Sequence, residues 1–138
     1  MTTSPTTELA GFFAELALED IPADVRRMAR VSLLDAIGVM LAGHAFLERE
    51  GEKELDRYLQ TLEGAEQATA LGFHRRAPWF AATFANGTLV EILDWQDSTL
   101  SARVHCGSGT IPAVLAAAEW NGLGGKFETI HYTTFFAD

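Results

Sequence analysis

Residues 86–119 read NGTLVEILDWQDSTLSARVHCGSGTIPAVLAAAE, and this stretch decides the fold, because an apolar helical segment enters it and another leaves it. Between the two segments stand carboxylates, hydroxyls, an arginine, a histidine and the only cysteine of the chain. Charged and hydrogen-bonding side chains are costly to bury without partners, so groups held between core helices need either protein partners or a ligand. The stretch therefore indicates two packed helices with part of an active site between them.

Helical spacing of apolar residues also governs the chain before this stretch. Residues 2–7 are polar and are expected to fray, and Leu9, Phe12, Phe13 and Leu16 then form one face of a short helix. A second helix is expected over residues 22–42, with Gly43 as its stop. A charged amphipathic surface helix should follow over residues 48–63.

Asp35 is unusual because it lies inside the apolar second helix. A buried carboxylate needs a partner, so we interpret it as paired with an arginine such as Arg30, or as hydrogen-bonded at a helix contact.

Residues 68–72 (ATALG) predict a buried strand or an extended connection, followed by a polar loop at residues 74–76. The basic residues of that loop are either a solvated corner or a clamp for a substrate anion. A fourth helix is expected over residues 77–93 and a fifth over 109–120. The fourth helix should bury one face, made of Phe80, Ala81, Phe84, Thr88, Leu89 and Ile92. The sequence thus predicts an all-α, multi-helical fold.

Composition excludes several classes of partner. The 138 residues suit one globular domain, and the net charge of −9 argues against nucleic acid. One cysteine cannot form an internal disulfide, and the N-terminus lacks the pattern of a signal peptide, so a cytoplasmic protein is expected. The longest apolar run, residues 31–43, falls short of the roughly 18 residues that a membrane span needs, so no membrane partner is predicted.

Two carboxylates, Asp94 and Asp97, are three residues apart and would share a face if the helix continued past them. Close carboxylates repel, which raises one pKa and suits acid–base work, although ordinary solvated charge gives the same spacing. The hydroxyl residues that follow, such as Ser98, either cap the next segment or bind a carboxylate through hydrogen bonds.

His105 titrates near neutral pH, and Gly107 would let a ligand approach the backbone closely. The run Gly107-Ser108-Gly109 opens a helix whose free N–H groups could face an anion. A histidine in a loop is also often structural. His105 and Cys106 are adjacent and lack a second pair of ligands, so neither a zinc site nor a cysteine nucleophile is predicted.

Five motifs occur in one order: residues 9–43, ATALG (68–72), FANGTLVEILDWQDS (84–98), HCGSGTIPAVLAAAE (105–119) and GLGGK (122–126). Together they resemble the N-terminal part of the MmgE/PrpD family, which includes 2-methylcitrate dehydratase, cis-aconitate decarboxylase and iminodisuccinate epimerase. The resemblance implies part of a large all-α domain, with the smaller α+β lid absent from this chain. It also implies a homodimer acting on small di- and tricarboxylates without metal or organic cofactor.

The resemblance further implies roles for individual residues. His105 would do the acid–base work, and Asp94 would orient it or act as the partner acid. The substrate-binding candidates are Asp97, Ser98, Arg103, Gly107, Ser108 and Lys126. This chain departs from the family at three positions, where Glu91, Gln96 and Cys106 replace a histidine, an acid and a proline. These departures leave dehydration, decarboxylation and epimerisation all open.

The end of the chain also departs from the family, because residues 127–138 (FETIHYTTFFAD) lack helical periodicity. We therefore expect an MmgE/PrpD-like helical segment over residues 1–126 and a divergent tail from a truncated or frame-shifted copy. Two functions remain open. One is a lyase-type enzyme, present as an N-terminal fragment that is inactive alone. The other is a non-catalytic helical domain that self-associates or pairs with a partner chain.

Overall fold

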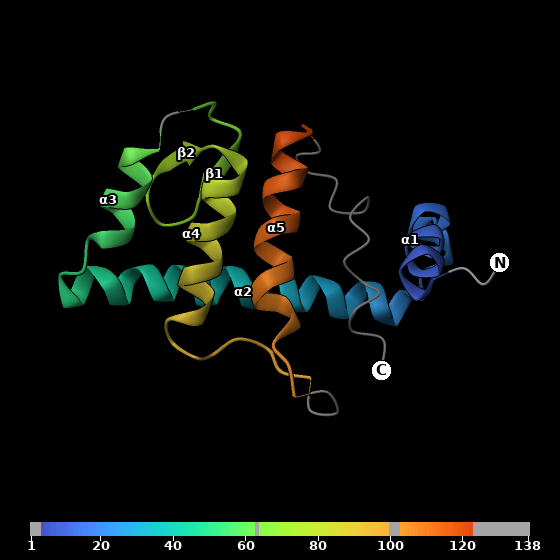
Figure 1. Ribbon diagram of the computed structural model, residues 1–138. Helices are drawn as coiled ribbons and strands as arrows, with labels where there is room; N and C mark the ends of the chain where they lie inside the picture. The colour runs from blue at the N-terminus through green and yellow to red at the C-terminus, as the bar shows by residue number, and fades with distance from the viewer. Residues whose placement is uncertain (1–3, 63, 100–102, 123–138) are drawn as a thin grey trace.

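The computed structural model describes residues 4–62, 64–99 and 103–122. Within these ranges the chain is mainly helical (Figure 1), which confirms the predicted all-α class. The predicted tail, residues 127–138, lies outside the described residues. In chain order the elements are α1 (Pro5–Glu15), the short 3-10 helix Leu18–Asp20, α2 (Ala23–Glu50), α3 (Glu54–Thr61), β1 (Ala68–Ala70), β2 (Arg75–Ala77), α4 (Trp79–Glu91) and α5 (Cys106–Trp120).

The long helix α2 is the base on which the other elements are arranged. Figure 1 shows α4 and α5 side by side, both crossing α2, with α3 near the C-terminal end of α2 and α1 near its N-terminal end. The hairpin of β1 and β2 lies at the start of α4, and the connection from α4 to α5 lies at the other end. Both ends of the central connection are therefore fixed by packed helices.

The predicted stop of the second helix at Gly43 is wrong. The helix continues to Glu50 and ends where Gly51 adopts a left-handed conformation, with φ of 74°. Gly43 is instead buried in the helix interior, and a Cβ built there would collide with the backbone carbonyl oxygen of Leu89. The glycine is therefore explained by the close crossing of α2 and α4, which a sequence pattern does not show.

The N-terminal and surface helices have different bounds from those expected. The first helix begins at Pro5, because the hydroxyl of Ser4 accepts a hydrogen bond from the N–H of Thr7, so the segment predicted to fray is partly helical. None of its residues is buried. The predicted surface helix is shorter than residues 48–63, because its first residues belong to α2.

The hairpin confirms the strand predicted at ATALG and corrects the polar loop after it. β1 pairs antiparallel with β2, and Thr69 lies opposite Arg76. The Arg76 guanidinium contacts the Glu119 carboxylate of α5 at 2.8 Å, and the same carboxylate oxygen accepts hydrogen bonds from the N–H and hydroxyl of Thr69. Arg76 therefore ties the hairpin to α5. The residues around the turn also line a hollow of about 300 Å³.

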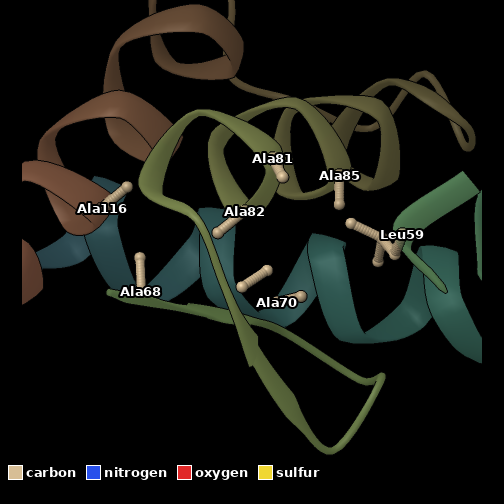
Figure 2. Close-up of a cluster of buried hydrophobic side chains, with 8 residues drawn as sticks. Leu59, Ala68, Ala70, Ala81, Ala82, Ala85 and Ala116 are labelled. Atoms are coloured by element: carbon tan, nitrogen blue, oxygen red, sulfur yellow. The ribbon is translucent and has the colours of Figure 1, made fainter. Parts of the chain in front are cut away.

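The fourth helix buries its small residues instead of its aromatic ones. Phe80 and Phe84, predicted as core, are 50% and 56% exposed. The buried face holds Ala81, Ala82, Ala85, Asn86, Leu89 and Val90. In Figure 2, alanines of α4 face Ala68 and Ala70 of the hairpin, Leu59 of α3 and Ala116 of α5. Small side chains let the backbones approach closely, so α3, the hairpin, α4 and α5 share one cluster in which Leu59 is the one large buried side chain.

A second cluster joins α2, α4 and α5. It contains Ala36, Val39, Met40, Leu89, Val90 and Ile111. Because Leu89 and Val90 come from the last turns of α4, this cluster lies nearest the connection to α5. It fixes the ends of the two helices between which the polar side chains stand.

By length and composition alone, α2 is apolar enough to cross a membrane. The expectation that no run approaches that length does not hold for this helix. A core helix of a soluble protein and a signal sequence near the N-terminus pass the same test. In α2, which begins near the N-terminus, four residues are buried.

Candidate functional site

The connection between α4 and α5 carries the predicted site and has a defined backbone at both described ends. Thr99 and Val104 form an isolated antiparallel bridge, in which the N–H of Thr99 donates to the carbonyl of Val104 at 2.9 Å. Asp94 and Arg103 both have positive φ, 52° and 53°. This conformation is uncommon outside glycine and often occurs where function requires it.

Asp97 binds to the first turn of α5. Its Oδ1 accepts a hydrogen bond from the N–H of Gly107 at 3.2 Å. A Cβ at position 107 would collide with the Asp97 carboxylate, so the glycine makes this approach possible. The first N–H groups of a helix have no partner within it, and a carboxylate at this end is favoured. The sequence predicted that the free N–H groups at the start of this helix could bind an anion. One of these groups, the N–H of Gly107, binds the carboxylate of Asp97 instead of a ligand.

The same aspartate also contacts the histidine. Nδ1 of His105 lies 2.8 Å from the main-chain carbonyl oxygen of Asp97, and the hydroxyl of Ser108 donates to the carbonyl of His105 at 3.0 Å. The structure thus brings together four of the predicted site residues: Asp97, His105, Gly107 and Ser108. The helix begins at Cys106, three residues earlier than predicted, which places His105 directly before its first turn.

Burial raises the pKa of Asp97, and this is the largest of several influences. The N–H of Gly107 lowers the pKa, the nearby carboxylate of Asp35 raises it, and His105 lowers it. The second carboxylate oxygen of Asp97 is buried and has no hydrogen-bond partner among the described residues. An atom that is buried in this way favours the protonated carboxyl, which can donate.

Asp35 is a neighbour of the site that the sequence analysis did not assign to it. It is exposed on α2, and within the described part of the chain its side chain makes neither the expected ion pair with Arg30 nor the alternative hydrogen bond at a helix contact. The expected pairing fails because residues five apart on a helix do not share a face. The one available signal was a carboxylate inside an apolar helix.

Three other predicted residues are not drawn into this arrangement. The side chains of Asp94, Ser98 and Arg103 are exposed, and over residues 4–62, 64–99 and 103–122 they make no hydrogen bond or ion pair. The shared helical face of the two aspartates does not form, because α4 ends at Glu91. Lys126 lies outside the described residues.

Two of the positions that depart from the family pattern contact each other. The side-chain amide of Gln96, which is buried, donates to the Glu91 carboxylate at 2.8 Å. This bond joins the last turn of α4 to the connection that follows. The two departures therefore form one local interaction in this chain.

A metal ion would need several nearby ligands. In the described segments no group of three or more histidine, cysteine, aspartate or glutamate side chains has that arrangement.

The chain belongs to the MmgE/PrpD family, because the model of the MmgE/PrpD N-terminal domain matches residues 7–131. The relatives that the chain matches are named as cis-aconitate decarboxylases or as cis-aconitate decarboxylase-like, which suggests a family of dehydratase or decarboxylase type. The chain is 34% identical over 120 residues to a cis-aconitate decarboxylase-like protein, oryM, of Aspergillus oryzae (strain ATCC 42149 / RIB 40). It is 28% identical over 117 residues to a cis-aconitate decarboxylase of Aspergillus terreus.

The two matches cover 86% and 83% of this chain but only 24% and 23% of the relatives. The chain therefore spans about a quarter of the length of the curated relatives that it matches. No solved structure matches the chain significantly.

Proposed function

We propose that this chain is the N-terminal part of a cofactor-independent lyase that acts on a small di- or tricarboxylate. The observation that carries the proposal is the placement of His105, an exposed imidazole fixed directly before the first turn of α5. The names of the relatives favour decarboxylation, with cis-aconitate as the first substrate to test. The proposal includes a cytoplasmic homodimer.

Each candidate reaction transfers a proton at a substrate carbon. In a dehydratase, a base removes a proton α to a carboxylate, and the electron pair expels hydroxide, which leaves as water after protonation. In a decarboxylase, the C–C bond to a carboxylate breaks, CO₂ leaves, and the electron pair left on carbon takes a proton from an acid. His105 suits either role because an imidazole can accept a proton as a base and donate one as an acid.

The remaining polar groups receive narrower roles. Asp97 is engaged with Gly107, so it does not offer its Oδ1 to substrate. We assign the binding of a substrate carboxylate to Ser98, Arg103, Lys126 and the N–H groups near Ser108. Asp94 is the proposed partner acid, since Nδ1 of His105 is already occupied by a carbonyl and Asp94 does not orient the ring.

Replacing His105 tests the proposal. In a full-length relative, the His→Ala change at the position matching His105 should lower kcat at least ~100-fold, the low end for an acid–base group. The assay follows loss of cis-aconitate, citrate or methylcitrate. Circular dichroism of His105→Ala in the present chain checks that the helices persist. A loss of kcat under threefold would remove His105 from the mechanism.

A second candidate function is favoured by one specific observation. Large apolar side chains are exposed on several elements, including Leu34 at 73% and Trp95 at 68%. Exposed apolar patches of several hundred Å² favour association. The alternative is a non-catalytic helical domain that self-associates or pairs with a partner chain. Turnover of any of the three acids by the isolated 138-residue chain would exclude it.

A further inference from the structure

We propose that Asp97 is a positioning residue that determines which nitrogen of His105 reacts. Its main-chain carbonyl holds Nδ1, its side chain fixes that carbonyl to the first turn of α5, and Nε2 is left as the reacting nitrogen. The assignment of a reaction to Nε2 rests on the proposed function. The position of the proton on Nδ1 does not depend on the proposed function. The tautomer and the proposed function can therefore be rejected separately.

The first step of the argument concerns the proton on the ring. Nδ1 of His105 lies 2.8 Å from the carbonyl oxygen of Asp97, well within hydrogen-bond range. A carbonyl oxygen can only accept, so Nδ1 must carry the proton. A neutral imidazole has a single ring proton, and Nε2 therefore holds the free electron pair.

The second step concerns what keeps the carbonyl in place. The Asp97 carboxylate accepts from the N–H of Gly107, two residues beyond the histidine, at 3.2 Å. Asp97 thus makes two contacts at the start of α5. Its main-chain carbonyl contacts His105, directly before the helix, and its side chain contacts Gly107 in the first turn. The hydroxyl of Ser108 donates back to the carbonyl of His105 at 3.0 Å and fixes the backbone on the other side of the ring. These three hydrogen bonds together fix the His105 ring and the backbone on both sides of it.

The third step concerns the reaction. In decarboxylation the doubly protonated ring acts as acid: the Nε2–H bond breaks, and a C–H bond forms with the electron pair that the departing CO₂ leaves on carbon. In dehydration neutral His105 acts as base: the C–H bond of the substrate breaks, an Nε2–H bond forms, and the electron pair of the C–H bond expels the β-hydroxide. The ring then carries protons on both nitrogens, and the Nδ1–H bond to the Asp97 carbonyl is kept throughout. Because the carbonyl dipole faces the developing positive charge, the same contact stabilises the imidazolium. The proton later leaves from Nε2 to the product or to solvent.

Nuclear magnetic resonance of the chain labelled with ¹⁵N-histidine tests the proton position without any turnover. Above the pH at which the ring loses its charge, we expect His105 to show one tautomer, with the proton on Nδ1. His105→Gln assigns the signal by removing it. A wild-type spectrum with the proton on Nε2, or with a rapid mixture of both forms, overturns the proposal.

Two variants separate positioning from general folding. Asp97→Asn keeps an oxygen that can accept from Gly107, so the Nδ1–H form should persist. Gly107→Ala places a Cβ where the carboxylate now lies, so the single tautomer should give way to a mixture, with helicity retained by circular dichroism. If Gly107→Ala retains the pure Nδ1–H form while folded, the side-chain part of the proposal is wrong. If either variant does not fold, the wild-type spectrum still decides the tautomer.

The outcome also separates this inference from the proposed function. A pure Nδ1–H tautomer, together with full activity after the His→Ala change in a full-length relative, would leave the geometry standing and reject His105 as the acid–base group. An Nε2–H tautomer together with a large loss of kcat would keep His105 in the reaction and reject the positioning role of Asp97.

Discussion

A single carboxylate, that of Asp97, is held by opposing influences at the start of α5. Burial and the Asp35 carboxylate favour its neutral form, while the N–H of Gly107 and the nearby His105 favour its charged form. Burial is the largest of these, and the pKa lies above the ordinary value of 3.8. When Asp97 is ionised, its burial therefore lowers the free energy of unfolding.

This cost predicts a particular pH dependence. Because the folded pKa of Asp97 is raised, the folded state binds a proton that the unfolded state has already released, and this favours folding at low pH. That stabilisation is complete below the unfolded pKa of 3.8 and is lost as pH rises through the higher folded value. Asparagine does not ionise, so the Asp97→Asn variant does not lose this stabilisation as pH rises. The free energy of unfolding of the variant relative to wild type should therefore rise from pH 3 toward neutral pH.

Urea unfolding of both proteins at a series of pH values measures the difference. Glu52→Gln, in the exposed connection between α2 and α3, removes one carboxylate elsewhere and reports the general effect of net charge. A difference between Asp97→Asn and wild type that is constant with pH, or that falls as pH rises, contradicts the raised pKa.

The site shows what residue types alone can and cannot predict. The short run of a histidine and two glycines before Pro112 was sufficient to predict that His105, Gly107 and Ser108 lie together at the start of a helix. The contribution of Asp35 was not predictable, because it lies 62 positions before Asp97 and only the packing of α2 against the connection brings the two carboxylates near each other. The expected closeness of Asp94 and Asp97 fails for a different reason, because it depended on α4 continuing past Glu91, where the helix ends.

At the scale of elements, periodicity predicted where helices exist better than which side they bury. In α4 the large side chains Phe80 and Phe84 fall on a helical repeat, yet they are exposed and the alanines are buried. Two helices and a hairpin approach α4 closely, and only small residues fit between their backbones. Hydrophobicity ranks phenylalanine above alanine and so selects the wrong face.

Helix ends were predictable where a cap depends on local chemistry. Pro112 and the glycines before it indicated the start of α5 to within three residues. Gly43 misled the prediction, because a glycine at a helix crossing and a glycine at a helix end look alike in a sequence. The second strand of the hairpin was missed because its residues, Arg75 and Arg76, are charged, and their strand conformation depends on pairing with β1 and on Glu119.

The crossing of α2 and α4 makes a testable prediction about two glycines of one helix. Gly43→Ala should destabilise the fold by about 1–3 kcal/mol, as overpacking of a tight core does, because its Cβ would collide with the backbone of Leu89. Gly38→Ala is the matched control. It lies on the exposed face of the same helix with nothing within 4 Å of its Cβ position, and should stabilise by about 1 kcal/mol.

Thermal or urea unfolding measures the stability of each variant relative to wild type, with a decrease expected for Gly43→Ala and an increase for Gly38→Ala. If Gly43→Ala is as stable as Gly38→Ala, the two helices do not cross as closely as the structure shows.

At the scale of the whole molecule, the buried core is small in side-chain volume and the exposed apolar surface is large. One core cluster contains Leu59 and otherwise only alanines, whereas thirteen large hydrophobic residues are exposed among those that the structure describes. Several of these lie along α2, at Met28, Val31, Leu34 and Leu41. In the described residues α1 buries nothing either, so the N-terminal half of the fold has much uncovered apolar area. The chain spans about a quarter of its relatives, and we propose that this area supports association.

The exposed face of α2 therefore predicts concentration-dependent self-association of the isolated chain. Within the described part of the chain, Leu34 is the most exposed large hydrophobic residue, at 73%, and Leu34→Glu should weaken association at least about tenfold. Burying a leucine contributes about 1.5–3 kcal/mol, and 1.4 kcal/mol corresponds to a tenfold change in affinity. The fold should be unaffected, because the Leu34 side chain is already exposed and its replacement uncovers no buried residue.

Sedimentation equilibrium of wild type and variant over a range of protein concentrations measures the change. Ala65→Glu adds the same charge in the exposed connection between α3 and β1 and removes little apolar area, so it should associate like wild type. Equal weakening by both variants would assign the effect to net charge instead of to the α2 face. A wild-type chain that stays monomeric at every concentration would reject self-association, and with it the form of the non-catalytic function that depends on a second copy of the chain.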